Sequence, residues 1–501
     1  MTLQKTIPGP AHCVMVLGTT SGAGKSWLTT ALCRWYARQG FKVAPFKAQN
    51  MSNNARVVAG PGGQSGEIGS AQYFQSLAAG AEPEVRMNPL LLKPEADTRS
   101  QVVLLGQVDA ALTEMPWRGR SEKVWPAIAR TLDALRADHD VVVIEGAGSP
   151  AEINLHASDI VNLRVARHAQ AECLLVTDID RGGAFAHLYG TWALLPEDER
   201  PFIQGFVLNK FRGDASLLAP GPEMLEQLTG VPTVAVVPMK WQHGLPEEDG
   251  VFDDRSAGVS GAVHTRIAVV AYPRISNLDE FQPLKNVPGV RLNWARSPAD
   301  LDGADWVILP GSKATAADLA WLRAQGLDQA VARHAERGGR VLGVCGGLQM
   351  LGEALIDTQG IDGNAPGLGL LPLVTTFEAE KTVRHTQARF AEVAAPWSAL
   401  SQVPLRGYEI HHGQTAQHPA MAAAGDVARE LIPGLAWQSA NGRVLGLYLH
   451  GLFEDAAVLQ ALFGADAPTL EQVFDRLADQ VEQCFDPAWL QRSCERVRAG
   501  R

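Results

Sequence analysis

The sequence predicts an α/β protein of two domains, and three observations carry this prediction. Short apolar runs alternate with helical patterns in both halves of the chain. In each half, one such run enters a tight glycine-containing turn that opens a helix, at residues 18–26 and again at residues 343–351. Between the halves, residues 246–263 are acidic, glycine-rich and aperiodic, as is typical of a linker.

The linker divides the chain into parts of domain size. We expect an N-terminal domain over residues 1–245, a C-terminal domain over residues 264–460 and a helical segment over residues 461–501. Six cysteines without a CxxC pair, and no recognisable secretion signal, favour a reducing, cytoplasmic compartment. The net charge of −10 and the lack of a long apolar run argue against nucleic-acid and membrane partners. Nothing in the sequence indicates an oligomeric state.

The first element is an apolar run, residues 13–17, that leads into the glycine-rich segment 18–26 and then a helical pattern. In this context the backbone N–H groups and the helix N-terminus bind phosphate, Lys25 adds a charge, and Ser26 supplies a hydroxyl for Mg²⁺. The usual loop has a glycine six positions before its lysine, where this chain has Thr19. A glycine-rich turn that binds no phosphate is the alternative. The residues expected to contact ATP are Gly18, Thr19, Thr20, Gly22, Ala23, Gly24, Lys25 and Ser26.

Further strand and helix patterns continue the first half. Strands are expected over residues 42–46, 141–144, 173–177, 202–208 and 233–237, with a helix over residues 124–135. This alternation predicts a doubly wound, mostly parallel sheet with helices on both faces. Within residues 87–94, two prolines bracket an apolar run, which favours a loop or an edge strand.

Polar side chains follow several of these strands, and strand ends are where α/β proteins bind ligands. Glu145 ends one strand beside the expected phosphate loop, so we expect it to be a second Mg²⁺ contact, with a surface carboxylate as the alternative. Asn209 is a candidate contact of the nucleotide base. The candidate substrate-binding residues are Lys47, Gln49, Asn50, Asp178, Asp180 and Arg181. The alternatives for these residues are a solvated loop and a turn in which the aspartate and arginine side chains pair with each other.

The second half opens with strands expected over residues 267–271 and 306–309. Its decisive segment places Cys345 at the apex of a tight turn between a strand and a helix, which is the pattern of a nucleophile elbow. The turn exposes the thiol, and the helix N-terminus favours the thiolate. Gly346, just after the nucleophile, and Gly311, after the earlier strand, are candidate oxyanion donors. A buried structural cysteine is the alternative.

A cysteine nucleophile needs a base, and His450 is the best candidate because it follows another apolar strand pattern. His411 and His412 fall in an expected polar loop, where they are candidates only for substrate contact. One half is therefore suited to bind ATP, and the other to hydrolyse an acyl substrate through a thioester. The presence of both sites in one chain predicts a glutamine-dependent amide ligase. In such an enzyme, ammonia attacks a carboxylate that ATP has activated as an acyl phosphate.

Several motifs resemble known families. The loop over residues 18–26 is similar to that of dethiobiotin synthetases, and residues 345–349 are similar to class I glutamine amidotransferases. The whole chain resembles the cobalamin-pathway amidotransferases, through further motifs at residues 45–52, 87–94, 145–155 and 178–183. The resemblance covers nearly the whole chain, so it implies a P-loop domain followed by a class I glutamine amidotransferase domain.

The resemblance implies ATP-, Mg²⁺- and glutamine-dependent amidation of the b, d, e and g carboxylates of adenosylcobyrinic acid a,c-diamide. It implies that Cys345 is the thioester nucleophile and His450 its base. Class I glutaminases carry a His-x-Glu pair, whereas here Glu454 stands four residues after His450. Glu454 is therefore the candidate third member of the triad.

Two other functions fit parts of the pattern. A cobyrinic acid a,c-diamide synthase performs similar chemistry on the preceding intermediate, although residues 47–52 and 178–183 favour the later enzyme. A partitioning-type ATPase switch with an inactive glutaminase domain usually carries a lysine early in its loop, where Thr19 and Thr20 stand here.

Overall fold

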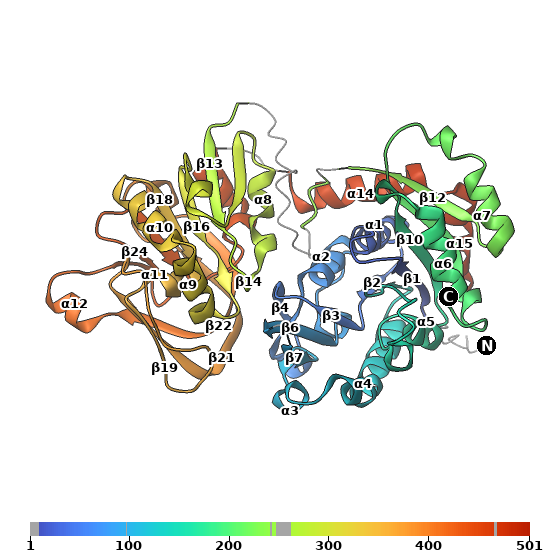
Figure 1. Cartoon of the computed structure of the whole chain (residues 1–501), viewed down its shortest axis with the longest axis horizontal. Coiled ribbons are helices and arrows are strands. Elements are labelled where there is room, and N and C mark those ends of the chain that lie inside the picture. Colours follow the sequence, from blue (N-terminus) through green and yellow to red (C-terminus); the bar gives the residue numbers. More distant parts are fainter. Residues whose placement is uncertain (1–9, 97, 241–242, 247–261, 465–467, 501) are drawn as a thin grey trace, which may run out of the picture.

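The computed structural model describes residues 10–96, 98–240, 243–246, 262–464 and 468–500, which form two lobes (Figure 1). The N-terminal lobe, blue to green, carries a six-stranded sheet, and the second lobe, yellow to orange, carries a seven-stranded sheet. The expected α/β fold is confirmed. Most of the expected linker, residues 247–261, lies outside the described residues. Among the residues described, no helix is long and apolar enough to cross a lipid bilayer.

The strands of the N-terminal sheet are all parallel and stand in the order β12-β11-β10-β1-β9-β2. Side chains of β1 alternate between two cores. Val14 and Val16 pack towards α1, whereas Cys13, Met15 and Leu17 pack towards α4. Helices therefore cover both faces, as expected. The strands are β1 (His12–Gly18), β2 (Val43–Phe46), β9 (Val141–Glu145), β10 (Glu172–Asp178), β11 (Ile203–Phe211) and β12 (Thr233–Pro238). The helices are α1 (Lys25–Arg38), α2 (Ser70–Ala78), α3 (Ala110–Thr113), α4 (Trp117–Asp138), α5 (Leu163–Ala169), α6 (Ala184–Leu194) and α7 (Gly221–Thr229).

Two small sheets extend this lobe towards the other one. The first has the order β3-β6-β7-β8, with β3 (Gln49–Met51), β6 (Leu90–Ala96), β7 (Arg99–Leu104) and β8 (Gln107–Val108). The second is the hairpin of β4 (Ala55–Ala59) and β5 (Ser65–Gly69). Residues 90–96 form a strand, as the loop-or-edge-strand expectation allows, but its apolar part is not at an edge because β6 lies between β3 and β7. Pairing with β3 stops at Leu92, so Pro94 lies where β6 has a neighbour on one side only, which sheets tolerate.

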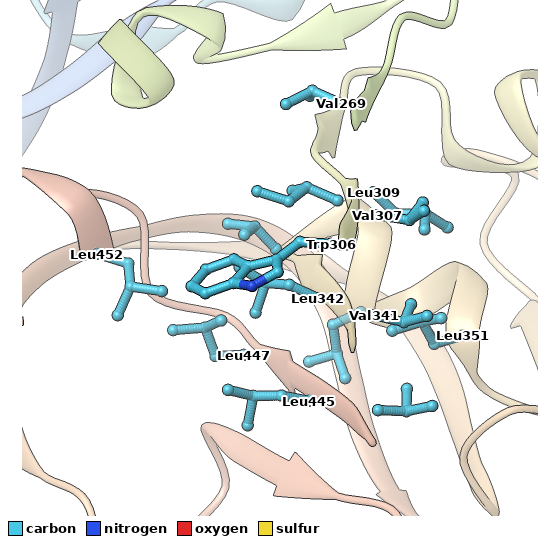
Figure 2. Close-up of a cluster of buried hydrophobic side chains, with 14 of the residues drawn as sticks. Val269, Trp306, Val307, Leu309, Val341, Leu342, Leu351, Leu445, Leu447 and Leu452 are labelled. Carbon is cyan, nitrogen blue, oxygen red and sulfur yellow. The ribbon is translucent and has the colours of Figure 1, made fainter. Parts of the chain in front are cut away.

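The seven-stranded sheet has the order β15-β13-β16-β18-β25-β24-β23, parallel as far as β25 and antiparallel beyond it. Figure 2 shows Trp306 of β16 packed among Leu342 of β18 and Leu447 of β25, in the core that supports the strand ends. The strands are β13 (Thr265–Val270), β15 (Val290–Ala295), β16 (Trp306–Leu309), β18 (Arg340–Val344), β23 (Arg429–Ile432), β24 (Ala436–Gln438) and β25 (Val444–Leu447). The helices are α8 (Gln282–Lys285), α9 (Thr315–Ala324), α10 (Leu327–Glu336), α11 (Gly346–Leu351), α12 (Pro419–Ala423) and α13 (Ala456–Phe463).

A smaller, four-stranded sheet of the C-terminal lobe faces the N-terminal lobe. It contains β19 (Ala354–Asp357), β20 (Ala365–Pro366), β21 (Leu373–Arg389) and β22 (Pro404–Gln417), and a short pair joins β14 (Ile275–Ser276) to β17 (Gly311–Ser312). His411 and His412 lie in β22, so the expectation of a polar loop there is wrong. The long hairpin partner β21 satisfies the backbone of this polar stretch, which local composition does not reveal.

The C-terminal helices α14 (Leu470–Cys484) and α15 (Pro487–Ala499) return to the N-terminal lobe (Figure 1). Apolar residues of both helices, including Leu477 and Trp489, are buried with α1 and one face of the six-stranded sheet. Arg34 of α1 pairs with Glu471 at 2.7 Å and with Asp475 at 2.8 Å. The helical segment expected at the C-terminus is thus part of the first lobe's core.

Candidate active sites

The phosphate loop lies between β1 and α1, and its glycines are required by local geometry. Gly22 and Gly24 have φ values of 71° and 102°, in the left-handed region that favours glycine. A Cβ at Gly18 would stand 3.0 Å from both Cδ and Nζ of Lys25, so the glycine at this position makes room for the lysine. Lys25 Nζ donates to the carbonyls of Thr20 at 3.1 Å and Gly148 at 3.2 Å. The lysine therefore lies inside the loop that the sequence predicts.

The loop is also supported from neighbouring strands. Thr19 donates from Oγ1 to Thr177 of β10 at 3.0 Å, so this residue, which replaces the usual glycine, anchors the loop. Asn209 Nδ2 donates to Ala23 O at 2.8 Å, and Lys210 Nζ donates to Gly22 O at 2.8 Å. Lys210 was not expected from the sequence, because no spacing rule links it to the loop.

Glu145 at the end of β9 is the centre of a buried polar cluster. Its Oε1 accepts from Ser26 Oγ and from Lys47 Nζ, both at 2.9 Å, and its Oε2 accepts from Gln75 Nε2 at 2.6 Å. Burial alone would raise the pKa of Glu145, but Lys47 and these hydrogen bonds outweigh it and hold the pKa below its usual range. The two expected Mg²⁺ contacts, Ser26 and Glu145, are therefore adjacent. A hydroxyl and an ionised carboxylate beside a phosphate loop fit Mg²⁺, which takes one or two protein oxygens plus phosphates.

The candidate substrate residues lie around the same edge of the sheet, but not all face the loop. Gln49 is buried, and its Oε1 has no hydrogen-bond partner among the described residues, while Asn50 donates to Gln72 at 3.1 Å. Asp178 lies 3.3 Å from Arg181 and 3.2 Å from Lys210, next to the loop. Asp180 instead forms an ion pair with Arg212.

Cys345 occupies the turn between β18 and α11 with φ 52° and ψ −108°, a conformation that is strained for a residue with a Cβ. The glycines beside it allow the turn to pack closely, since a Cβ at Gly346 would stand 2.7 Å from Ser312 N. A Cβ at Gly311 would stand 3.0 Å from His450 Cε1, which places this glycine beside the histidine. Strained turns of this kind are typical of nucleophile elbows.

His450 follows β25 and contacts Cys345 on one side and a carboxylate on the other. Its Nδ1 lies 3.0 Å from Glu280 Oε1, and the N–H of Gly451 donates to Glu280 Oε2 at 3.0 Å. Burial would lower the pKa of His450, but Glu280 and the charge and hydrogen bond of Cys345 outweigh it and raise the pKa to about 10. His450 therefore lies between Glu280 and Cys345, which is the arrangement of a cysteine nucleophile beside an oriented base.

The expectation that Glu454 is the carboxylate of this triad is corrected by the structure. Glu454 lies 2.7 Å from Arg56 of β4, whereas the carboxylate at His450 is Glu280. Glu280 lies in the short 3₁₀ helix Leu278–Phe281, 170 positions before His450 in the chain. Glu280 is far from His450 in the sequence, and its local signal is only an acidic pair, Asp279-Glu280, in the mixed segment that follows the strand expected over residues 267–271.

His411 and His412 do not join the cysteine–histidine pair. His411 Nε2 lies 3.2 Å from Glu409, and its ring stacks on Tyr448 with centroids 4.0 Å apart. His412 Nδ1 lies 3.1 Å from Glu378 O, and burial lowers its pKa to about 4.

Comparisons with known proteins match both lobes of the chain. A CobQ/CobB/MinD/ParA nucleotide binding domain matches residues 14–248, and a CobB/CobQ-like glutamine amidotransferase domain matches residues 266–458. A protein of Acidovorax sp. (strain JS42) named cobyric acid synthase is 79% identical over 485 residues, which cover 97% of this chain and 98% of that protein.

More distant relatives carry the same name. Cobyric acid synthase of Variovorax paradoxus (strain S110) is 76% identical, over 96% of this chain and 98% of its own. That of Leptothrix cholodnii (strain ATCC 51168 / LMG 8142 / SP-6) is 65% identical, over 96% of this chain and 97% of its own. The chain therefore belongs to the cobyric acid synthase family, glutamine-dependent amide ligases of cobalamin biosynthesis.

Proposed function

We propose that the chain amidates the b, d, e and g carboxylates of adenosylcobyrinic acid a,c-diamide, using ATP, Mg²⁺ and glutamine, in the cytoplasm. One observation carries the proposal: a phosphate loop beside a Ser26–Glu145 pair and a cysteine elbow beside a His450–Glu280 pair occur in one chain. Identity of 79% to a protein named cobyric acid synthase supports this substrate over its precursor, cobyrinic acid.

In the C-terminal lobe, the thiolate of Cys345 adds to the side-chain amide carbon of glutamine, and the N–H groups of Gly346 and Gly311 stabilise the oxyanion. His450, protonated beside Glu280, gives its proton to the leaving nitrogen, so the C–N bond breaks and ammonia departs. Neutral His450 then takes a proton from water as the water attacks the thioester. Glutamate is released, and the thiolate and the imidazolium are restored.

In the N-terminal lobe, an oxygen of the substrate carboxylate attacks the γ-phosphorus of ATP, ADP leaves, and an acyl phosphate forms. The N–H groups of the loop and Lys25 stabilise the charge on the transferred phosphoryl group. Ser26 and Glu145 would hold Mg²⁺, which supplies further positive charge at the phosphates. Ammonia attacks the acyl carbon, phosphate leaves, and the amide remains. We assign substrate contacts to Gln49 and Arg181 among the candidate residues.

Mass spectrometry of the a,c-diamide incubated with ATP, Mg²⁺ and glutamine tests this function. Each replacement of OH by NH₂ lowers the mass by about one dalton, so four successive decreases are expected. A parallel incubation with cobyrinic acid is the control. Amidation of cobyrinic acid but not of its a,c-diamide would assign the chain to the preceding step instead.

A further inference from the structure

The side chain of Arg56, in the N-terminal lobe, contacts the C-terminal lobe that carries Cys345 and His450. It lies in the hairpin strand β4, and only 1% of its surface is exposed. Its guanidinium forms an ion pair with Asp279 and lies 2.7 Å from Glu454, both of which belong to the C-terminal lobe. A buried cation placed across a domain boundary is costly unless its partners are fixed.

The backbone on either side of Arg56 is docked onto the same segment. The N–H of Ala55 donates to Asn277 Oδ1 at 3.0 Å, and the N–H of Leu278 donates to Asn54 Oδ1 at 3.0 Å. This reciprocal pair joins residues 54–56 to residues 277–279, which are directly followed by Glu280. The contact therefore reaches the segment that carries the partner of His450.

The two carboxylates that pair with Arg56 lie close to Glu280, the partner of His450. Asp279 precedes Glu280 in the chain, and Glu454 lies near Gly451, whose N–H donates to Glu280. Burial raises the pKa of Glu454, Arg56 opposes this effect, and Asp279 and Glu280 add to it. Three carboxylates are thus close together, Glu280 contacts His450, and Arg56 pairs with the other two.

Tyr408 of β22 provides a second contact between Arg56 and the histidine. Its ring stacks on His450 with centroids 5.2 Å apart and planes 20° apart. The guanidinium carbon of Arg56 lies 5.1 Å from the centroid of the same ring. Arg56 therefore contacts the surroundings of His450 both through carboxylates and through an aromatic ring.

We propose that Arg56 is a positioning residue through which the N-terminal lobe completes the glutaminase site of the C-terminal lobe. It compensates the charge of Asp279 and Glu454 and fixes the segment that holds Glu280 against His450. Without it, the buried carboxylate of Asp279 and the partly exposed carboxylate of Glu454 lose their cation and repel Glu280, so that Glu280 is no longer held against the imidazolium. The inference rests on the proposed glutaminase activity, but not on the identity of the corrinoid.

The test uses Arg56→Met in the full chain, with glutamate release measured across pH, and ammonia-dependent amidation as a second readout. We expect kcat for glutamine hydrolysis to fall at least about tenfold, with KM changed less, and the acidic limb of the pH profile to move to higher pH. Ammonia-dependent amidation stays within about twofold of wild type. Arg34→Met, which breaks the ion pairs between α1 and α14, is the matched control and leaves glutamine hydrolysis unchanged.

A double variant separates charge compensation from folding. Adding Asp279→Asn to Arg56→Met removes one uncompensated carboxylate, so part of the lost kcat and part of the pH shift are expected to return. An unchanged kcat and pH profile in Arg56→Met, or an equal loss of ammonia-dependent amidation, overturns the proposal. If the a,c-diamide is not amidated but glutamine hydrolysis still depends on Arg56, the proposed substrate is wrong and the proposed role of Arg56 is supported.

Discussion

Each lobe contains one buried glutamate at its candidate site, and the two are compensated in different ways. Glu145 is bound by Lys47, Gln75 and Ser26, all from its own lobe. Glu280 is bound by His450 and by the N–H of Gly451, and a cation from the other lobe compensates its surroundings. Both carboxylates are only 1% exposed, so burial does not distinguish them.

The difference follows from the task proposed for each carboxylate. A lysine and neutral donors keep Glu145 ionised, as a metal contact beside phosphates must be. A histidine partner gives Glu280 a neighbour that changes charge during the reaction, as general acid–base catalysis requires. The two sites are also linked, because the hairpin that carries Arg56 leads into α2, whose Gln75 binds Glu145.

The largest expected effects separate the two lobes by nitrogen source. Cys345→Ser is expected to lower glutamine-dependent amidation by more than about 10³-fold and to leave ammonia-dependent amidation intact, since the nucleophile is needed only to release ammonia. Lys25→Ala is expected to stop synthesis with either source, because the phosphoryl group loses its cation. Glutamine hydrolysis that survives Cys345→Ser would show that another residue is the nucleophile.

Exchanging each buried glutamate for glutamine tests the comparison directly. Glu280→Gln is expected to lower glutamine hydrolysis by about 10²–10⁴-fold, because the histidine loses the carboxylate that orients and charges it. Glu145→Gln is expected to lower amidation by about 10²-fold with either nitrogen source, through weaker Mg²⁺ binding. Initial rates with glutamine and with ammonium salts measure both effects. Identical profiles for the two variants would contradict separate roles.

The stability of the C-terminal lobe is expected to depend on pH through His450. Its pKa rises from 6.5 to about 10 on folding, so the ion pair with Glu280 stabilises fully below about pH 6.5 and is lost as pH rises towards 10. The free energy of unfolding of wild type should exceed that of Glu280→Gln by about 1–3 kcal/mol near pH 6. This difference should become smaller by pH 9. Thermal melting at each pH checks this. Glu145→Gln is the control, because its partner is not a histidine.

The smallest effect is expected at Gly18, where a Cβ would press on Lys25 from 3.0 Å. Gly18→Ala is expected to raise the KM for ATP several-fold, since the lysine must shift by a few tenths of an ångström. Gly190→Ala, in α6, is the control: nothing stands within 4 Å of a Cβ there, so the KM for ATP should change by less than about twofold. Equal effects of the two changes would mean that room for Lys25 is not what the glycine provides.

The sequence by itself determined the elements whose signals are local. The phosphate loop, Glu145 at a strand end, and the elbow at Cys345 each depend on neighbours within about ten residues, where steric and hydrogen-bonding rules act directly. The parallel sheet followed from alternating strands and helices. His450 was identified only as a candidate base, because its pairing with Cys345 spans separate strands.

Only the tertiary structure decided the contacts between distant segments. Glu280, not Glu454, contacts His450. Glu454 instead forms an ion pair with Arg56 across the boundary between the lobes. The C-terminal helices complete the core of the first lobe, and His411 lies in a strand because a hairpin partner pairs with a polar stretch. Charge compensation and burial depend on which groups meet in space, and no period or spacing within the chain specifies that.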